Sequence, residues 1–306
     1  MNGKIVTVVG GSGFLGRYVV QHLAQAGFRV RVLCRRPSDA LFIKTSGVVG
    51  QIGCDYVDLT KPESLSGKLN GSYAVVNLAG ILFQSGRQRF DKVQAKGAEL
   101  LAMEAKRSGV MHFIQLSALG VDKATQSAYA RSKLDGEAAI RALFPQAVIL
   151  RPSVMFGAED NFINQFASMG VLSPVLPLIG GGKTRFQPVY VDDVAEAVLA
   201  ALTLPAAQGK LFELGGPDTL TFREILKYIG TQTGHQRCLI RIPSCLASLM
   251  AIPASLLPTP PITRDQIKLL KTDNVLSGEH PGFAELDITP QPLSAVVPHY
   301  LARFRK

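Results

Sequence analysis

One glycine-rich turn near the N-terminus constrains the fold of this chain more than any other feature. An apolar, β-branched run from Ile5 to Val9 leads into Gly10, Gly13 and Gly16, which are spaced three residues apart. Such a run is typical of a strand that is buried on both faces. The glycines permit a tight turn and a close approach of the backbone to a pyrophosphate, which the free N–H groups of a following helix can bind.

A helix is expected directly after this turn. Five apolar residues fall on one helical face, and they are Leu15, Val19, Val20, Leu23 and Ala24. Gly27 follows them, as a glycine commonly does where a helix ends. The motif lies between a predicted strand and a predicted helix. This order favours a dinucleotide site over an ordinary turn.

The alternation of strand and helix patterns continues to about residue 150. Further strands are expected at 29–34, 52–57, 73–78, 111–116 and 147–151, with a helix over 90–108. Strands that alternate with helices predict an α/β fold with a doubly wound parallel sheet of the Rossmann type, covered by helices on both faces.

The alternation of strand and helix patterns stops after residue 152, where a loop-rich stretch with many glycines and prolines begins. Strands at 186–190 and 211–214, with a helix over 192–202 between them, are expected to rejoin the sheet. We therefore predict a dinucleotide-binding domain over 1–152, with 183–213 rejoining its sheet. The remainder of 153–306 is predicted to form a smaller substrate or docking lobe over the carboxyl ends of the strands, where ligands bind in open α/β sheets.

The composition indicates a folded protein with a cationic surface. Hydrophobic residues make up 47% of the 306 positions, and the net charge is +10. This charge suggests an anionic partner such as a phosphorylated cofactor, a membrane surface or an acidic protein face. There is no basic run with interleaved aromatics that would indicate nucleic acid. Four scattered cysteines fit a reducing compartment, five dispersed histidines predict no metal site, and the N-terminus lacks a signal-peptide pattern, so we expect a cytoplasmic protein.

An uncharged stretch runs over the 22 positions 242–263, between Arg241 and Arg264. Its length would permit a membrane span, but its five prolines argue against a spanning helix. A short helix is expected over 244–257. Two interpretations remain open: the stretch packs inside the second lobe, which we favour, or it docks on a bilayer surface or a partner protein.

The residues at the end of the second strand indicate whether a chain of this type prefers NAD(H) or NADP(H). An acidic residue there would bind the ribose hydroxyls of NAD, but this chain has Cys34 followed by Arg35 and Arg36. Guanidinium groups bind a 2′-phosphate, so the sequence favours NADP(H) over NAD(H), unless both arginines are merely solvated. Asp58 follows the third strand and either accepts a hydrogen bond from the adenine amino group or caps the next helix.

Ser117, Tyr129 and Lys133 form a second constellation. Ser117 ends the fifth strand, and Tyr129 and Lys133 are four residues apart, so they share a face of a helix. A lysine ammonium near the phenol would lower the tyrosine pKa toward neutrality, and the serine hydroxyl would hold a carbonyl oxygen of a substrate. These three residues are the candidate catalytic set for hydride transfer. The alternative is that the lysine only binds the ribose hydroxyls and no turnover occurs.

Several motifs together resemble the extended and atypical short-chain dehydrogenase/reductases. They are 10–16, 77–80, Tyr129 with Lys133, and 151–157. The stretches 13–20, 156–162, 187–191 and 262–265 are more specific, and they resemble the family of NADPH-binding accessory subunits of respiratory complex I and their bacterial relatives. The resemblance covers nearly the whole chain. It implies a tightly held NADPH, generally regarded as structural in that family, and a place beside the quinone-binding arm near the membrane.

Matching motif positions imply a set of cofactor contacts. They are Gly10, Ser12, Gly13, Phe14, Leu15, Arg35, Arg36, Asp58, Ala79, Gly80, Tyr129, Lys133 and Pro152. Asp192 and Asp193 are expected to be structural, since acidic residues suit the start of a helix. The first hypothesis for function is thus an NADP(H)-holding homologue of the accessory subunit, peripheral at the inner face of the membrane through 242–264. The alternative is an active NADPH-dependent reductase or isomerase of a hydrophobic, quinone- or lipid-like carbonyl substrate.

Overall fold

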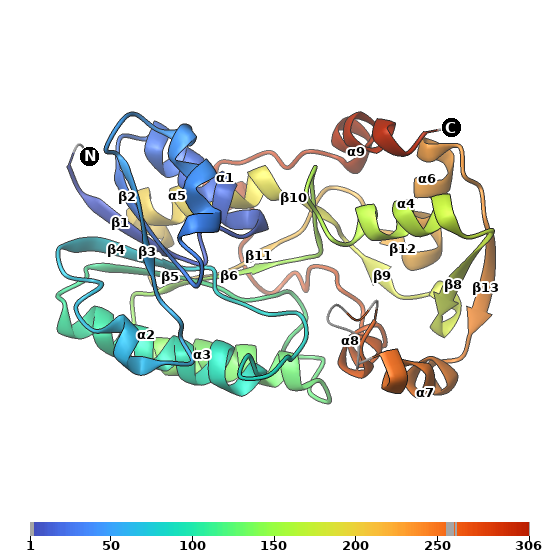
Figure 1. Cartoon of the computed structure of the whole chain (residues 1–306), viewed down its shortest axis with the longest axis horizontal. Helices are drawn as coiled ribbons and strands as arrows, with labels where there is room; N and C mark the ends of the chain where they lie inside the picture. Colours follow the sequence, from blue (N-terminus) through green and yellow to red (C-terminus); the bar gives the residue numbers. More distant parts are fainter. Residues whose placement is uncertain (1–2, 255–259, 261, 306) are drawn as a thin grey trace.

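A seven-stranded sheet lies at the centre of the larger part of the molecule (Figure 1). The computed structural model describes residues 3–254, 260 and 262–305. All neighbouring strands of this sheet run parallel, in the order β3-β2-β1-β4-β5-β6-β11. The strands are β1 (Ile5–Val9), β2 (Arg29–Cys34), β3 (Ile52–Tyr56), β4 (Ser72–Asn77), β5 (His112–Leu116), β6 (Val148–Pro152) and β11 (Leu211–Leu214).

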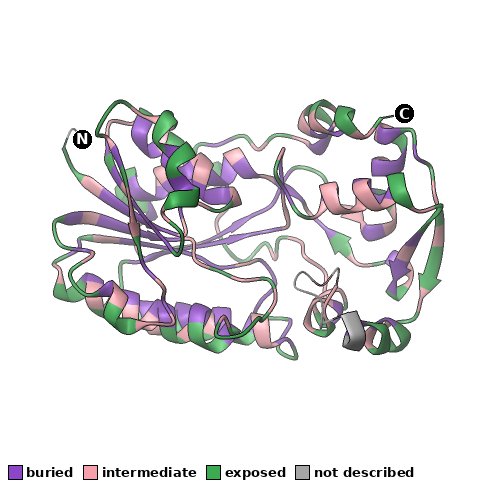
Figure 2. Cartoon of the chain, in the orientation of Figure 1, coloured by how far each residue is buried: buried purple, intermediate pink, exposed green. Residues whose placement is uncertain are grey.

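Helices cover both faces of this sheet. The helices α1 (Phe14–Gln25) and α5 (Val191–Thr203) pack together on one face, and α2 (Gly97–Arg107) and α3 (Ala128–Leu143) pack on the other. Figure 2 shows that the strands are buried over most of their length, whereas the outer sides of α2 and α3 face solvent. The predicted α/β fold with a doubly wound parallel sheet is therefore confirmed. The predicted helix over 90–108 is a π-helical segment, Asp91–Lys96, that continues directly into α2.

One expected strand does not join the central sheet. Residues 186–190 divide into β9 (Arg185–Phe186), which pairs with β12 (Leu220–Thr221), and β10 (Val189–Tyr190), which pairs with β7 (Met155–Phe156). The strand at 211–214 does rejoin the sheet, as β11. The division falls at Gln187 and Pro188, because Pro188 has no N–H to donate to a ladder and the chain changes partners there.

The C-terminal lobe lies beside the sheet and has its own aromatic core (Figure 1). Phe162, Phe166, Phe186 and Phe222 stack on one another with ring centroids 5.4 to 6.3 Å apart. This spacing is the one that aromatic rings prefer. The remaining elements of the lobe are α4 (Ile163–Leu172), β8 (Val175–Ile179), α6 (Phe222–Thr233), β13 (Cys238–Ile242), α7 (Ser244–Ala254), α8 (Arg264–Leu269) and α9 (Leu293–Leu301).

Where the structure describes it, the uncharged stretch 242–263 packs inside the second lobe, as the favoured interpretation expects. In α7, Ala247 and Ala251 are buried against Ile179 of β8 and Ile267 of α8. The helix also carries three exposed apolar side chains, Leu246, Leu249 and Met250, which are 48 to 63% exposed. The end of the predicted helix over 244–257 lies outside the described residues. Among the helices of the described ranges, none is long and apolar enough to cross a membrane.

Asp193 is an acidic residue that the fold buries near the start of α5. It is 6% exposed, and its Oδ2 accepts a hydrogen bond from the Gln291 N–H at 2.7 Å. Burial raises its pKa to about 6, and the charges of Asp192 and Glu196 act in the same direction. The folded state therefore holds this proton more tightly than the unfolded state does. The stability that Asp193 contributes is full below about pH 4 and is lost as the pH rises through about 6.

We predict that Asp193→Asn removes this loss of stability at neutral pH. The amide oxygen can still accept from Gln291, and no buried charge has to form. The variant should exceed the unmodified protein by about 1–2 kcal/mol in free energy of unfolding at pH 7.5 and match it near pH 4. Denaturant titrations at both pH values measure this, with Asp135→Asn on the exposed side of α3 as the control. Parallel pH profiles for Asp193→Asn and the unmodified protein would contradict the assignment.

Candidate nucleotide-binding site

A pocket of about 640 Å³ lies where the carboxyl ends of the central strands meet the C-terminal lobe. Its wall includes the residues that follow β1, β2, β4 and β5, together with residues of α3 and α8. In the sheet, β1 lies between β2 and β4, so the chain crosses from one side of β1 to the other at this place. Such a switch point is where open α/β sheets bind dinucleotides.

The glycine turn forms one side of the pocket. Gly10 has a φ of 81°, and a Cβ there would lie 3.1 Å from the Ala79 backbone nitrogen. Only glycine suits this left-handed backbone at such a close approach. Gly13 is the N-cap residue of α1, and within the described residues no side chain caps this helix and no acidic residue lies in its first turn. The N-terminus of α1 therefore offers free N–H groups and a positive dipole end to an anion.

Ser117 lies in the pocket wall directly after β5. The residue is 2% exposed, and its Oγ has no hydrogen-bond partner among the described residues. A buried hydroxyl without a partner costs free energy, so such a group commonly marks a position that a ligand fills. The donor set of the pocket thus fits a bound nucleotide or a substrate carbonyl.

Tyr129 and Lys133 both reach the pocket from α3, as the four-residue spacing predicts. Lys133 is buried, and its Nζ donates to the Leu116 carbonyl oxygen at 3.1 Å. The same Nζ lies 6.0 Å from the centre of the Tyr129 ring. Tyr129 stacks edge-on against Phe90, with ring centroids 5.7 Å apart. The Lys133 ammonium therefore lies near the Tyr129 ring and binds the carbonyl at the end of β5.

The electrostatics of this pair differ from the sequence expectation. Burial raises the pKa of Tyr129 to about 12, where the lysine was expected to lower it. Burial lowers the pKa of Lys133 to about 8, and the Glu137 carboxylate only partly opposes this. The cost of burying a phenolate therefore sets the direction of the Tyr129 shift. The expected shift of the Tyr129 pKa toward neutrality is thus wrong.

The two arginines after β2 point to different places. Arg35 lines the pocket, whereas Arg36 is not part of its wall. The Arg36 side chain is 82% exposed, and its Nη1 lies 3.7 Å from the Asp39 carboxylate. Arg36 therefore has the solvated position that the sequence left open as an alternative, and Arg35 alone of the two lines the pocket.

Asp58 lines the pocket and also caps its own turn. Its Oδ1 accepts from the Thr60 N–H at 2.9 Å and from the Thr60 hydroxyl at 2.8 Å. Burial alone would raise its pKa, but the hydrogen bonds from Thr60 and Gln88 and the charge of Arg35 outweigh it and lower the pKa. These bonds close a turn from Asp58 to Thr60, but the next helix, Pro62–Leu65, begins after Lys61 with no side-chain cap, so the expected capping of that helix by Asp58 is wrong.

The structure gathers nearly all of the predicted contacts around one pocket. Besides the residues described above, its wall contains Ser12, Phe14, Leu15, Ala79, Gly80 and Pro152. Of the predicted cofactor and catalytic residues, Arg36 alone lies outside it. No cluster of three or more metal-ligating side chains occurs in the described part of the chain.

Part of the wall was not expected from the sequence. The C-terminal lobe contributes, among others, Asn161, Phe162, Gln165, Phe186, Gln266, Leu269, Leu270, Thr272, Asp273 and Asn274. Phe162, Phe186, Leu269 and Leu270 give this part of the wall apolar surface beside its polar side chains. Apart from the 156–162 motif, no local sequence pattern marks these residues, because they come from separate segments that only the fold brings together.

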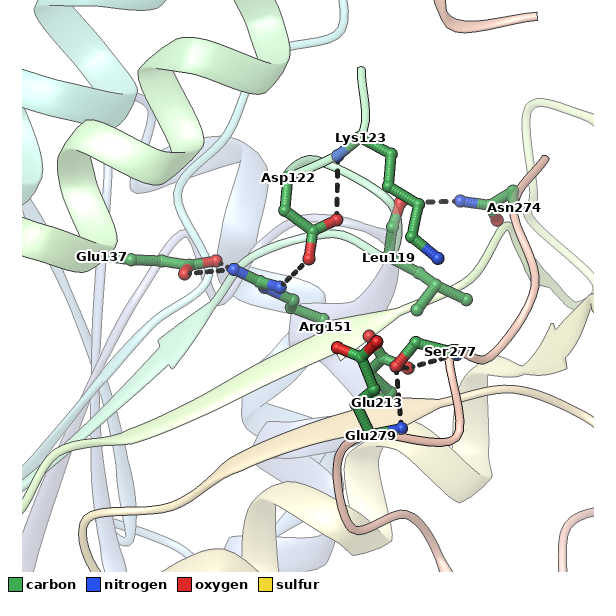
Figure 3. A network of polar contacts seen from close by, with 9 residues as sticks. All are labelled: Leu119, Asp122, Lys123, Glu137, Arg151, Glu213, Asn274, Ser277 and Glu279. Carbon is green, nitrogen blue, oxygen red and sulfur yellow. Dashed lines mark hydrogen bonds and ion pairs between the residues drawn. The ribbon is translucent and has the colours of Figure 1, made fainter. Parts of the chain in front are cut away.

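A network of buried polar contacts fixes the elements around this pocket (Figure 3). Arg151, at the end of β6, is 5% exposed and binds the Glu137 carboxylate of α3 at 2.9 and 2.8 Å. Its Nη1 also binds Asp122 at 2.9 Å. A bidentate, buried pair of this kind holds two elements in one orientation. The 151–157 motif thus fixes α3, and with it Tyr129 and Lys133, against the sheet.

The segment after α8 is tied to the same strand ends. The Asn274 side chain donates to the Leu119 carbonyl oxygen at 2.8 Å and accepts from the Ser153 hydroxyl at 2.6 Å. Farther along, the buried Glu213 of β11 accepts from the Ser277 backbone and hydroxyl at 2.7 and 2.8 Å, as Figure 3 shows. The lobe is therefore fastened to the carboxyl ends of β6 and β11.

Comparison with known proteins places this chain in a family. Residues 6–215 match the model of the NAD dependent epimerase/dehydratase family. The chain belongs to this family. A dTDP-glucose 4,6-dehydratase from Streptomyces venezuelae, solved with NAD bound, has the same fold, with a TM-score of 0.74 over 97% of this chain and 96% of that chain at 18% identity.

Relatives with higher sequence identity show which members of the family this chain resembles. Subunit 9 of the alpha subcomplex of mitochondrial NADH dehydrogenase [ubiquinone] 1 from Arabidopsis thaliana is 36% identical over all of this chain and 79% of its own length. The mouse protein of the same name is 33% identical, again over the whole chain and 81% of that protein. A ceramide reductase from Caulobacter vibrioides is 33% identical over 78% of this chain and 74% of that protein. The resemblance to the complex I accessory subunits is confirmed.

Proposed function

We propose that this protein is an NADP(H)-holding accessory subunit of a membrane-bound NADH:quinone oxidoreductase, in which the nucleotide mainly stabilises the fold. The observation that carries this proposal is that the groups that would hold a nucleotide line one pocket between the sheet and the C-terminal lobe. The full-length similarity to complex I subunits supports the same role.

In this proposal the chain holds the nucleotide along the carboxyl ends of β1, β2, β4 and β5. Gly10, Ser12, Gly13, Phe14 and Leu15 supply the turn and the N-terminus of α1 to the pyrophosphate. Arg35 meets the 2′-phosphate, Asp58 the adenine, and Lys133 the nicotinamide ribose. The other flanking contacts come from Ala79, Gly80, Tyr129 and Pro152. When bound beside a substrate, NADPH would supply a hydride.

A ligand of this kind can matter without chemistry. A molecule that binds only the folded state stabilises it by about 2.7 kcal/mol at a hundredfold excess over its Kd. The pocket joins both parts of the molecule, since its wall comes from the central strands and from the lobe. A bound nucleotide would therefore hold the lobe to the Rossmann domain, and Tyr129 would need to transfer no proton.

We predict that the protein binds NADPH at least tenfold more tightly than NADH, a difference of about 1.4 kcal/mol. Arg35→Ala should remove most of this preference, because Arg35 is the arginine of the pair that lines the pocket. Arg36→Ala is the matched control, since Arg36 is exposed and pairs with Asp39. Calorimetry of both nucleotides on the three proteins measures the preference. Equal affinities in the unmodified protein would refute it.

The exposed face of α7 is the part that we propose to meet the membrane. Leu246, Leu249 and Met250 offer apolar side chains, and Arg241 and Arg264 flank the uncharged stretch. Shallow insertion of such a face, helped by the net charge of +10, suits an anionic lipid surface. We place the protein accordingly in the cytoplasm, at the inner face of the membrane beside the oxidoreductase.

A second candidate function is an NADPH-dependent reductase of a hydrophobic, quinone- or lipid-like carbonyl substrate. Two observations favour it: the unpartnered Ser117 hydroxyl, and the apolar wall that Phe162, Leu269 and Leu270 give to the pocket. Ser117 would donate a hydrogen bond to the carbonyl oxygen, and Tyr129 would donate the proton that completes the alcohol. The similarity to a ceramide reductase supports a substrate of this class.

One experiment separates the two candidates. The tagged chain is purified from detergent-solubilised membranes of its host, and the NADH:quinone activity that accompanies it is measured together with the bound nucleotide. The first proposal expects respiratory activity and NADP(H) in the same fractions. Recovery of the chain free of respiratory subunits, with NADPH oxidation that depends on an added hydrophobic ketone, would contradict it in favour of the reductase.

A further inference from the structure

The motif at 262–265 places a carboxylate of the C-terminal lobe against the helix that carries Tyr129. Asp265, in the first turn of α8, receives three hydrogen bonds from the start of α3. Its Oδ1 accepts from the Ala128 N–H at 2.8 Å, and its Oδ2 accepts from the Tyr129 N–H at 3.1 Å and from the Ser127 hydroxyl at 2.6 Å. A residue more than 130 positions away thus closes the N-terminus of α3.

The first N–H groups of a helix have no partner within the helix. In α3 the Ala130 N–H donates to the Ser127 hydroxyl oxygen at 3.2 Å, and the Arg131 N–H donates to the Ser127 carbonyl oxygen at 3.1 Å. The remaining two, on Ala128 and Tyr129, are the ones that Asp265 satisfies. Hydrogen bonds to a carboxylate are strong, and a negative charge at this end of a helix is favourable.

The helix α8 is itself held firmly enough to act as an anchor. Thr263 and Gln266 form a capping box at its start, with bonds of 2.8 and 3.2 Å. Ile267 is 1% exposed and packs in the apolar cluster with Ala247 and Ala251 of α7. Gln266 and Leu269 of the same short helix line the nucleotide pocket. One element therefore forms part of the pocket wall and fixes the start of α3.

We propose that Asp265 is a positioning residue of the nucleotide site. By holding the first turn of α3, it sets the place of Tyr129 within that turn and of Lys133 one turn farther along. The C-terminal lobe thereby completes the half of the pocket that lies over β4 and β5. This inference rests on the proposed NADP(H) binding and adds a residue that touches no part of the nucleotide itself.

If Asp265 positions α3, it should affect one half of the pocket and not the other. The glycine turn, Arg35 and Asp58 follow β1, β2 and β3, on the adenosine side of the switch point. Ser117, Tyr129 and Lys133 follow β5, on the other side. A ligand that consists of the adenosine half alone should therefore be insensitive to Asp265, whereas the complete nucleotide should not.

The test measures the Kd of NADPH and of adenosine 2′,5′-bisphosphate by calorimetry on Asp265→Asn. This change keeps the volume but turns one accepting oxygen into a donor that faces other donors. We expect NADPH to bind about tenfold more weakly and the bisphosphate to bind within about twofold of its normal affinity. Asp265→Glu, which keeps the carboxylate, should recover part of the loss. Asp135→Asn makes the same chemical change on the exposed side of α3 and should alter neither Kd.

Each other result counts against the inference. Unchanged affinity for both ligands in Asp265→Asn would show that α3 needs no anchor from the lobe. Parallel loss of both ligands, together with a lowered thermal midpoint, would show a general role in folding and not in positioning. If the unmodified protein bound neither ligand, the proposed function and this inference would fail together.

Discussion

Replacing Gly13 by valine should weaken NADPH binding at least about a hundredfold, which corresponds to about 2.7 kcal/mol. Gly13 begins α1 and lines the pocket, so the two methyl groups of valine would occupy the place where the pyrophosphate meets the helix N-terminus. The backbone can accept the change, because Gly13 has φ −77° and ψ −177°, which other residues adopt readily. Within 4 Å, a Cβ there meets only the Gly10 carbonyl oxygen among the described residues, at 3.3 Å.

A substitution at Gly13 should affect ligand binding while leaving the fold intact, unlike one at Gly16. A Cβ on Gly16 would lie 2.6 Å from the Gly10 carbonyl oxygen, so any substitution there would disturb the turn itself. Gly53→Val is the matched control, because a Cβ on this strand residue has no neighbour within 4 Å among the described residues. Calorimetry with NADPH and thermal unfolding without nucleotide are measured on both variants. Normal NADPH affinity in Gly13→Val would contradict the assignment of the pocket.

Tyr129→Phe should leave NADPH affinity within about threefold of normal, and any reductase activity should fall by about 10²- to 10⁴-fold in kcat. Phenylalanine keeps the edge-on contact with Phe90 at 5.7 Å and removes only the hydroxyl. Lys133→Met is the contrasting variant. It removes the ammonium from the Leu116 carbonyl and from the ribose position, so NADPH binding should weaken at least about tenfold.

Kinetics with candidate hydrophobic ketones and NADPH, beside calorimetry, measure both effects. A Tyr129→Phe protein that reduces a substrate as fast as the unmodified protein would rule out Tyr129 as the proton donor. Loss of NADPH binding in Tyr129→Phe would show that the nucleotide depends on the Tyr129 hydroxyl and not only on a flanking contact with the ring, which would contradict the expected result.

The parts of the site that lie near one another along the chain could be predicted from sequence. Ile5–Val9, the glycine turn and α1 form a local pattern whose geometry follows from chain stereochemistry alone. Tyr129 and Lys133 share a helical face because their spacing matches the helical repeat. In each case a few neighbouring residues determine the local structure, and the observed fold agrees with the prediction.

The remainder depends on contacts between distant segments. Arg35 and Arg36 are neighbours in sequence, but Arg35 lines the pocket while Arg36 is exposed beside Asp39, and no local pattern distinguishes them. The pKa of Tyr129 follows burial that the neighbouring sequence does not reveal. Asp265 stands in a motif that the sequence singles out, but its partner Ser127 is visible only in the fold.

The central claim is that the nucleotide serves the structure of a respiratory assembly, and one measurement tests it directly. A strain of the host that lacks this chain is complemented with the unmodified protein, Tyr129→Phe or Gly13→Val, and the NADH:quinone activity of its membranes is compared. We predict that Tyr129→Phe restores the activity fully and that Gly13→Val does not. Loss of activity with Tyr129→Phe at full nucleotide occupancy, or full activity with Gly13→Val lacking nucleotide, would contradict the claim.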